Sequence, residues 1–285
     1  MHLKIRSMKR AKVFLTLGLF LSGFALAAFA QEEAKTEEST KWKKKPAFSF
    51  KLGAFFPSIT AKFRVDAPAG APGTEVDVNK DFGLAKTATT FRLDGDIRIA
   101  KWFSVDLAYY GHSRSKEEAL SKDIVIGDKT YYLNQTVKTT LRNDFYTADF
   151  KFYLINKQRL ELGVYAGINL AHFKLTFDAQ EIDRQLQIKK VWAPVPSLGV
   201  HFAYTLLPRV YLYGKAGYFA FSPSKRTKFN SAAASLNLDW YFYKFMGIGA
   251  RYEYNSFNLD IDVASYQGNV KYNTSGFNGY LTIGF

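Results

Sequence analysis

Cysteine is missing from all 285 residues, so the chain can form no disulfide and carries no lipid anchor on an N-terminal cysteine. The sequence also contains no glycine-rich phosphate-binding motif and no group of histidines and cysteines at metal-ligand spacing. After residue 30, no apolar run reaches the length of about 20 residues that a transmembrane helix needs. These absences predict a protein without a cofactor and without a metal site.

The first 30 residues have the pattern of a secretory signal peptide. The apolar stretch Val13–Leu26 follows a basic region, and Ala28-Phe29-Ala30 fits a cleavage site, so Gln31 is the expected mature N-terminus. The apolar stretch is short for a spanning helix, which makes an uncleaved membrane anchor the less favoured alternative. The basic residues of this region are Lys4, Arg6, Lys9, Arg10 and Lys12.

Residues 31–47 are expected to form a disordered periplasmic tail, because they contain glutamates and then lysines with almost no apolar side chains. The remainder, residues 48–285, is long enough for one large all-β domain. Its excess of basic residues suits contact with outer-membrane lipid, including anionic lipopolysaccharide, although solvated charges in loops explain it equally well. Export makes nucleic acid a poor candidate as a partner.

Strand-forming and small residues dominate this remainder, since the chain has 26 Phe, 18 Tyr and 20 Gly but only 8 Pro. Apolar and polar side chains alternate with a period of two, which indicates β-strands with a different environment on each face. Within Thr89–Ile99, for example, Phe91 and Leu93 alternate with Arg92 and Asp94. About ten residues are also enough for a tilted strand to cross a bilayer.

The alternating pattern recurs in ten segments, joined by connections that are by turns long and polar or very short. This rhythm is typical of a transmembrane antiparallel up-and-down β-barrel, with long extracellular loops and short periplasmic turns. An even strand number would leave both mature termini in the periplasm. The segments are Phe48–Val65, Thr89–Ile99, Phe103–Tyr109, Tyr146–Leu154, Leu160–Leu170, Trp192–Tyr204, Arg209–Phe221, Ser231–Phe242, Met246–Asn255 and Gly276–Phe285.

The count is about ten strands, with eight or twelve as alternatives because one stretch, Ile124–Leu141, is ambiguous. At Pro57 the apolar set changes phase, which predicts a bulge or the point where the strand leaves the membrane. The stretches Asp66–Lys86 and Ser113–Gln135 are expected to be loops. The stretch Ile124–Leu141, which overlaps the second of these, could instead contribute an extra hairpin.

The last segment, Gly276–Phe285, ends the chain on an aromatic residue. With the signal sequence, the ten segments and the loop rhythm, it resembles the small outer-membrane β-barrel proteins of Gram-negative bacteria, the OmpA- and OmpW-like group. The resemblance implies a place in the cell outer membrane and insertion by the barrel-assembly machinery, with Tyr280, Ile283 and Phe285 in the C-terminal assembly signal. Because lipid does not tolerate open strand edges, this segment should pair with Phe48–Phe56.

Charged residues at the inward positions of these strands predict a polar lumen. Six cations nearly balance seven anions, as buried charges require. A barrel of about ten strands is close to the size that side chains fill. This size favours a lumen closed by a salt-bridge network, and a narrow conduit for small solutes is the less favoured alternative. The inward residues are Lys51, Arg92, Asp94, Asp96, Arg98, Asp106, Asp149, Lys151, Glu161, Lys215, Asp239, Arg251 and Glu253.

The sequence Trp192-Ala193-Pro194-Val195-Pro196 is unusual for a barrel strand, because each proline removes a donor from the hydrogen-bond ladder. One interpretation places this piece outside the membrane, beyond the strand proper. The other is a weakened lateral seam at Pro194 and Pro196, beside the fifth or seventh strand, through which a lipid-like ligand could pass.

The sequence does not favour an enzyme. The histidines after the signal segment are His112, His172 and His201, and Arg114 stands where the histidine–serine spacing of outer-membrane lipid hydrolases would need a serine. His112 and His172 could still form an acid/base site at the barrel rim with one nearby carboxylate. The candidate acids are Asp178, Glu181 and Asp183.

We therefore expect an outer-membrane β-barrel with a structural role or a narrow passage for small solutes. Two alternatives stay open: an enzyme that modifies lipid A or phospholipid, and a binding protein or adhesin that acts through its surface loops.

Overall fold

The computed structural model describes residues 44–66, 73–126, 129–179, 184–187, 191–224, 227–263 and 266–285, all within the compact unit Trp42–Phe285. The expected signal peptide and most of the expected tail lie outside these residues. Residues 44–47, also expected in the tail, are described, and they contact the barrel through Lys44 and Lys45.

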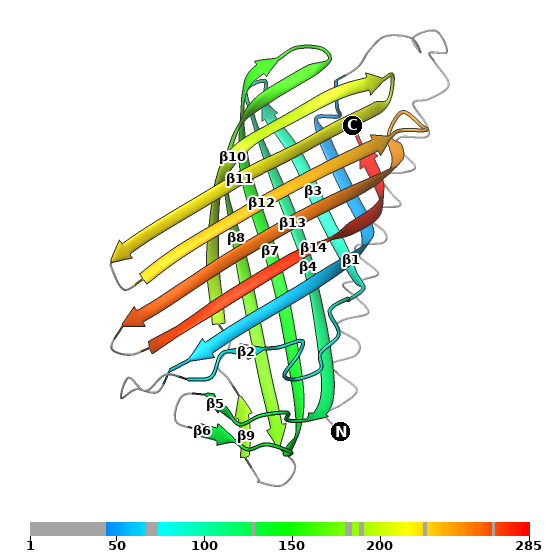
Figure 1. Ribbon diagram of the computed structural model, residues 1–285. Helices are drawn as coiled ribbons and strands as arrows, with labels where there is room; N and C mark the ends of the chain where they lie inside the picture. Colours follow the sequence, from blue (N-terminus) through cyan, green and yellow to red (C-terminus); the bar gives the residue numbers. More distant parts are fainter. Residues whose placement is uncertain are drawn as a thin grey trace, which may run out of the picture. The chain divides into compact units, whose positions relative to one another are not determined.

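Ten long strands of the described chain form one antiparallel up-and-down barrel, which confirms the predicted all-β fold (Figure 1). Each strand pairs with the next, β14 pairs with β1, and β10 pairs with β8 on one side and β11 on the other. The strands are β1 (Phe48–Val65), β3 (Thr90–Ala100), β4 (Phe103–Ala119), β7 (Thr136–Asn156), β8 (Leu160–Ala179), β10 (Val191–Leu207), β11 (Val210–Ser224), β12 (Thr227–Trp240), β13 (Met246–Val263) and β14 (Tyr266–Gly284).

Four short strands complete the described secondary structure: β2 (Val76–Asp77), β5 (Ile124–Ile126), β6 (Lys129–Tyr131) and β9 (Arg184–Gln187). β2 pairs with β1 and β9 with β8, whereas β5 and β6 form a separate hairpin. The extra hairpin that the sequence left open therefore exists, but it is not part of the barrel wall. The described residues contain no helix that is long and apolar enough to cross a bilayer.

The last strand closes the barrel against the first, as predicted. Phe50 lies opposite Ile283 and Phe56 opposite Phe277, and the backbone groups of Phe48 and Phe285 exchange hydrogen bonds of 3.0 and 2.9 Å. Both ends of the barrel chain therefore lie at the edge that carries the short turns.

The bulge, one of the two alternatives expected at Pro57, is absent. The register of β1 against β14 runs unbroken from Ser49–Gly284 to Val65–Gly268, so the strand keeps its phase through the proline. Phe55 and Ile59 are fully buried at inward positions. Before Pro57 most apolar residues of β1 face outward, and after it they face inward. They change face because the interior of the barrel changes there from polar to apolar.

Several strands are longer than the alternation predicted. The polar stretch expected as a loop after residue 113 instead continues β4 to Ala119, and β7 begins at Thr136. β13 and β14 likewise extend through the polar stretch between Asn255 and Gly276. The 21 residues of β7 are about twice what a membrane strand needs, so part of the wall stands beyond the apolar band.

Candidate functional site

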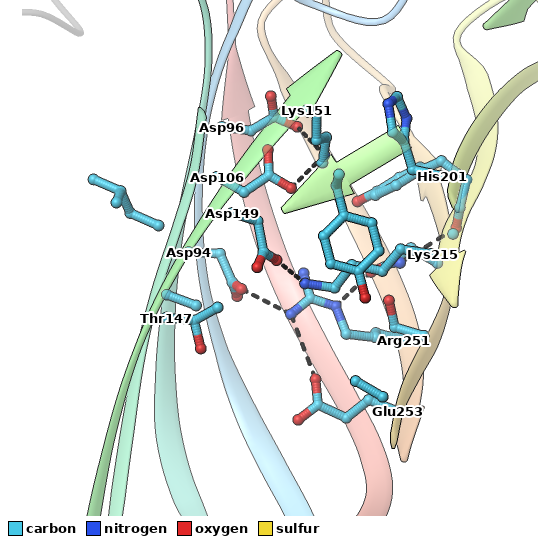
Figure 2. A pocket seen from close by; sticks show the side chains of 18 of the residues that line it. Asp94, Asp96, Asp106, Thr147, Asp149, Lys151, His201, Lys215, Arg251 and Glu253 are labelled. Atoms are coloured by element: carbon cyan, nitrogen blue, oxygen red, sulfur yellow. Dashed lines mark hydrogen bonds and ion pairs between the residues drawn. The ribbon is translucent and has the colours of Figure 1, made fainter. Parts of the chain in front are cut away.

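The polar half of the interior lies nearest the short turns and is filled with paired charges. In the described chain, seven cations and seven carboxylates make ion pairs there, including all thirteen residues expected from the sequence and, in addition, Lys45. Figure 2 shows ten labelled residues of this region, which come from β3, β4, β7, β10, β11 and β13. The pairing leaves this half of the lumen without formal net charge.

A quartet of charges joins β3 to β13 across the lumen. Arg251 Nη1 lies 2.7 Å from Asp94 Oδ1 and 3.9 Å from Glu253 Oε2. Arg92 Nη1 lies 2.7 Å from Glu253 Oε1, and its Nη2 lies 3.1 Å from Asp94 Oδ1. Each arginine therefore contacts both carboxylates, an arrangement in which any single loss leaves a buried charge without a full partner.

A second group surrounds Asp96, whose carboxylate pairs with Lys45 and lies 4.0 Å from Lys151 Nζ. Lys151 also pairs with Asp106, and Lys215 pairs with Asp149. Nearby, Arg98 Nη2 lies 2.7 Å from Glu161 Oε2.

Asp239 is fully buried and holds the third group together. Its carboxylate accepts hydrogen bonds from Tyr213 at 3.0 Å and from Tyr280 at 2.5 Å, and it lies 3.5 Å from Lys51 Nζ. Tyr280, expected in the terminal assembly signal, thus points into the lumen, whereas the side chain of Phe285 is exposed on the outer wall. A Cβ on Gly249 would collide with both Tyr280 and Asp239, so this position must lack a side chain.

Lys45 is the one charged member of these groups that sequence reasoning missed. It lies in a run of lysines just before the first strand, and the alternation carries no information there because the run precedes the strand. Only the approach of this segment to the barrel end brings Lys45 to Asp96.

The space left between these side chains is small. A cavity of about 80 Å³, measured as room for the centre of a water molecule, lies among Arg92, Asp149, Lys215 and Arg251. A buried water needs roughly 10–15 Å³ by this measure, so the cavity has room for only a few waters between charged groups that already have partners.

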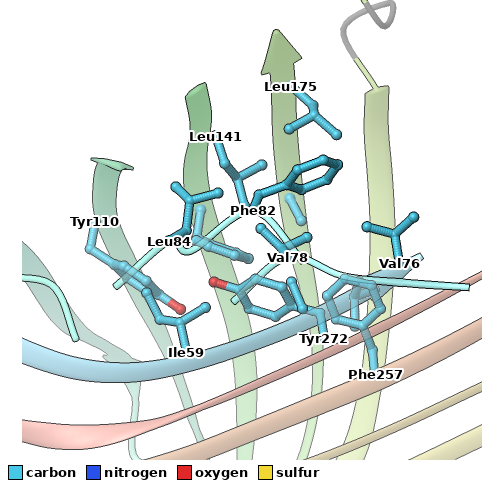
Figure 3. Packing of buried hydrophobic residues seen from close by; sticks show 14 of the residues in the cluster. Ile59, Val76, Val78, Phe82, Leu84, Tyr110, Leu141, Leu175, Phe257 and Tyr272 are labelled. Atoms are coloured by element: carbon cyan, nitrogen blue, oxygen red, sulfur yellow. The ribbon is translucent and has the colours of Figure 1, made fainter. Parts of the chain in front are cut away.

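The other half of the interior is an apolar core. Residues 73–89, here called the inner segment, contribute Val76, Val78, Phe82 and Leu84, each at most 3% exposed. Figure 3 shows these side chains packed between the walls of the barrel, against residues of β1, β4, β7, β8, β13 and β14. Burial of side chains of this kind stabilises by about 1.5–3 kcal/mol each, so the inner segment is a firmly packed part of the fold.

Backbone hydrogen bonds also tie the inner segment to β1. Val78 donates to the Ala61 carbonyl at 2.9 Å, Ile59 donates to Lys86 at 2.6 Å, and Ala88 donates to Pro57 at 3.1 Å. Part of the stretch expected as a loop after the first strand therefore lines the inside of the barrel.

The two prolines lie within β10 and not beyond it. Pro194 is opposite Leu170 and Pro196 is opposite Ile168 in an unbroken register with β8. Proline has no N–H, yet the ladder between β10 and β8 is intact. The backbone nitrogens of Pro194 and Pro196 must therefore face β11 and not β8.

On that side the ladder stops early. β10 and β11 pair only from Gly199–Gly217 toward the short turns, and the described residues Val191–Leu198 of β10 have no partner in β11. The Ser231 hydroxyl of β12 donates to the Pro196 carbonyl at 2.7 Å and so satisfies one free acceptor. A cavity of about 30 Å³, lined in part by Val195 and Ser231, lies behind this seam.

The three histidines are separated. His112 points inward, with its Nε2 3.2 Å from Asn143 Nδ2, whereas His172 points outward, with its Nδ1 3.4 Å from Asp144 Oδ2. His201 lies in the polar lumen, 3.3 Å from the Phe152 carbonyl. The idea of a rim site that combines His112 and His172 is wrong, because they lie on opposite faces of the wall. Of its candidate acids, Glu181, Asp183 and the side chain of Asp178 lie outside the described residues.

His172 and Asp144 form the one histidine–carboxylate pair of the described chain, on the outer wall. Tyr109 and Arg142 also bond to Asp144, and the His172 ring stacks on Trp192 with centroids 4.5 Å apart. The described residues contain no group of three or more histidine and acidic side chains placed to hold a metal ion.

No protein-family model and no curated protein matches this sequence. Among solved structures, the outer-membrane protease OmpT of Escherichia coli superposes with a TM-score of 0.55 at 13% identity, covering 88% of this chain and all of that one. OprG of Pseudomonas aeruginosa matches with a TM-score of 0.37 at 10% identity, covering 86% of this chain and 100% of that one. Ail of Yersinia pestis matches with a TM-score of 0.30 at 13% identity, covering 83% of this chain and 99% of that one.

The likeness to OmpT shows a shared fold, and at such low identity it does not extend to protease activity. The chain has the architecture of the Gram-negative outer-membrane β-barrels, which agrees with the resemblance drawn from its alternating segments.

Proposed function

Taking the chain as a barrel of the Gram-negative outer-membrane kind, we propose that it is a sealed outer-membrane protein whose role is structural and is exerted at its wall and loops. One observation carries this proposal: paired charges fill one half of the lumen and the packed inner segment fills the other half. An ion would have to break several buried ion pairs in the first half and displace an apolar core in the second. We assign the short turns and both barrel termini to the periplasmic side, as such barrels require.

Thiol labelling tests the sealed lumen, because the chain has no cysteine of its own. Ala108→Cys places a thiol in the wall of the polar cavity, and Ser115→Cys places a matched thiol on the exposed outward face of the same strand. A membrane-impermeant thiol reagent should modify the second variant within minutes and leave the first unmodified in the folded protein.

Planar-bilayer recordings of the purified protein provide the functional arm. We expect no conductance steps above the leak of the bare bilayer. Regular steps together with labelling of Ala108→Cys would instead establish the narrow polar conduit.

The seam between β10 and β11 supports a second candidate function, the lateral entry of a lipid-like molecule. The two prolines remove two donors from the strand edge where the ladder ends, which disfavours further pairing of that edge with β11. If the seam admits a ligand, Pro194→Val with Pro196→Val should lower uptake of a fluorescent fatty acid from vesicles, because new N–H donors would favour pairing with β11. Uptake equal to that of the unmodified protein would remove this candidate.

A further inference from the structure

Arg114 is an exception to the charge pairing of the interior. Its side chain lies on the inward face of β4, in the apolar half, and the residue is 6% exposed. No carboxylate of the described chain lies within ion-pairing distance of it. Its Nη1 donates to the Ala85 carbonyl of the inner segment at 2.6 Å, but its Nε and Nη2 are buried without any hydrogen-bond partner.

Further unpartnered polar atoms lie on the neighbouring inward positions. His112 is two residues away on the same face, and Asn143 lies opposite it on β7. If the Asn143 amide donates to His112 Nε2, as their 3.2 Å contact indicates, the imidazole hydrogen sits on Nδ1, which is buried without a partner. The hydroxyl of Thr139, fully buried on the same face of β7, has no partner either.

Arg114 Nε and Nη2, His112 Nδ1 and the Thr139 hydroxyl can all donate a hydrogen bond, whereas Asn143 Oδ1, which is also buried without a partner, can only accept one. A buried donor without an acceptor is costly, and a buried guanidinium without a counter-charge is costlier still, so folded proteins seldom retain either. A ligand that both accepts hydrogen bonds and carries negative charge would remove both penalties. Nε and Nη2 form one edge of the guanidinium fork, which matches two oxygens of a carboxylate or phosphate.

We propose that Arg114 binds a small oxyanion between the inner wall of β4 and β7 and the inner segment, with His112 flanking the site on one side along the wall and Thr139 on the other. The ligand class is a carboxylate or phosphate small enough to fit under the packed core. Because Arg114 also holds the Ala85 carbonyl, the bound anion fastens the inner segment to the wall. This site does not depend on the proposal that the lumen is sealed. It lies in the apolar half of the interior, and it would be present whether or not ions pass through the polar half.

Thermal unfolding in detergent micelles tests the site with sodium acetate and sodium phosphate as probes, each compared with sodium chloride at equal ionic strength. Four proteins are compared: the unmodified chain, Arg114→Met, Arg114→Lys and Arg142→Met. Arg142 is the matched control, because it is an arginine of β7 whose side chain is 59% exposed on the outer face.

We expect acetate or phosphate to raise the unfolding midpoint of the unmodified protein and of Arg142→Met by several degrees over chloride. Arg114→Met should lose this rise, and in chloride it should unfold at or above the midpoint of the unmodified protein, because it removes an uncompensated charge. Arg114→Lys keeps the charge without the fork and should show a reduced rise. A rise with phosphate alone, or with acetate alone, identifies which oxyanion the site takes.

Three results would overturn the site. The first is the absence of any rise with either probe in the unmodified protein. The second is an unfolding midpoint of Arg114→Met that acetate or phosphate raises as much as that of the unmodified protein. The effect would then come from the general exclusion of these salts from the protein surface and not from a bound anion. The third is a large loss of stability of both Arg114 variants in chloride, which would make the arginine a structural group that needs no anion.

Discussion

Replacing Arg251 by methionine tests whether the charge quartet of the lumen holds β3 and β13 together. Methionine approximates the length of the arginine stem and removes its charge. Asp94 and Glu253 would then share Arg92 as their remaining partner in the quartet, and the Asn237 side chain would lose the hydrogen bond that it accepts from Arg251.

The expected loss of stability follows from the burial of the quartet. The side chains of Arg251 and Asp94 are 8% and 11% exposed, and that of Glu253 is 6% exposed, so water screens them poorly. Removal of one partner from a buried ion pair costs about 3–5 kcal/mol, because the other charge stays buried without compensation. We expect Arg251→Met to fall in this range.

The double variant Arg251→Met with Asp94→Asn separates this mechanism from a loss of packing. It removes one charge of each sign and leaves the Arg92–Glu253 contact of 2.7 Å in place. The two changes together should therefore cost less than the sum of the single changes, by about 1–3 kcal/mol. The exposed Arg142→Met is the control; it removes an ion pair with Asp144 at the outer surface and should change stability by no more than about 1 kcal/mol.

The measurement is equilibrium unfolding by urea in lipid vesicles, followed by tryptophan fluorescence. A stability of Arg251→Met within about 1 kcal/mol of the unmodified protein would contradict the reasoning, since it would mean that water screens the quartet. Strict additivity of the two changes would show instead that Arg251 acts through packing and not through its charge.

Two further predictions concern the inner segment and the closing strand. Phe82→Ala should lower the free energy of unfolding by about 3–5 kcal/mol, because it leaves a cavity in a packed core; a loss below about 1 kcal/mol by the same urea titration would mark the segment as loosely held. Deletion of Phe285 should reduce the amount of protein assembled in the outer membrane, because two backbone hydrogen bonds to Phe48 close the barrel there. Unchanged outer-membrane levels on a membrane fractionation would contradict that role.

The alternation of side chains was enough to predict the wall of the barrel. Within a strand the side of each residue depends only on parity, so Arg92 and Asp94 could be assigned to the lumen without knowledge of any partner strand. Strand ends were harder to predict. Where β4 passes beyond the apolar band, both of its faces become polar and the alternation fades, although its hydrogen-bond ladder with β7 continues to Ala119 and Thr136.

The assumption of a uniform interior caused the error at Pro57. A polar lumen was expected along the whole of β1. Apolar residues at inward positions after Pro57 were therefore interpreted as a change in which side of the strand faces the lumen. The inner segment accounts for the difference, because it enters the barrel and surrounds Ile59 with other apolar side chains. Its burial depends on contacts between residues far apart in the chain, which no local pattern reports.

The sequence by itself therefore determined the class of the protein: the strands, their inward and outward faces, and the closure of the last strand on the first. These properties follow from local periodicity and from the rule that strand edges must be paired. Only the tertiary structure decided which charges meet, where the ladder beside Pro196 ends, and that Arg114 lies buried without a counter-ion among the described residues. Those properties depend on the distances between strands across the lumen, and alternation along one strand carries no information about such distances.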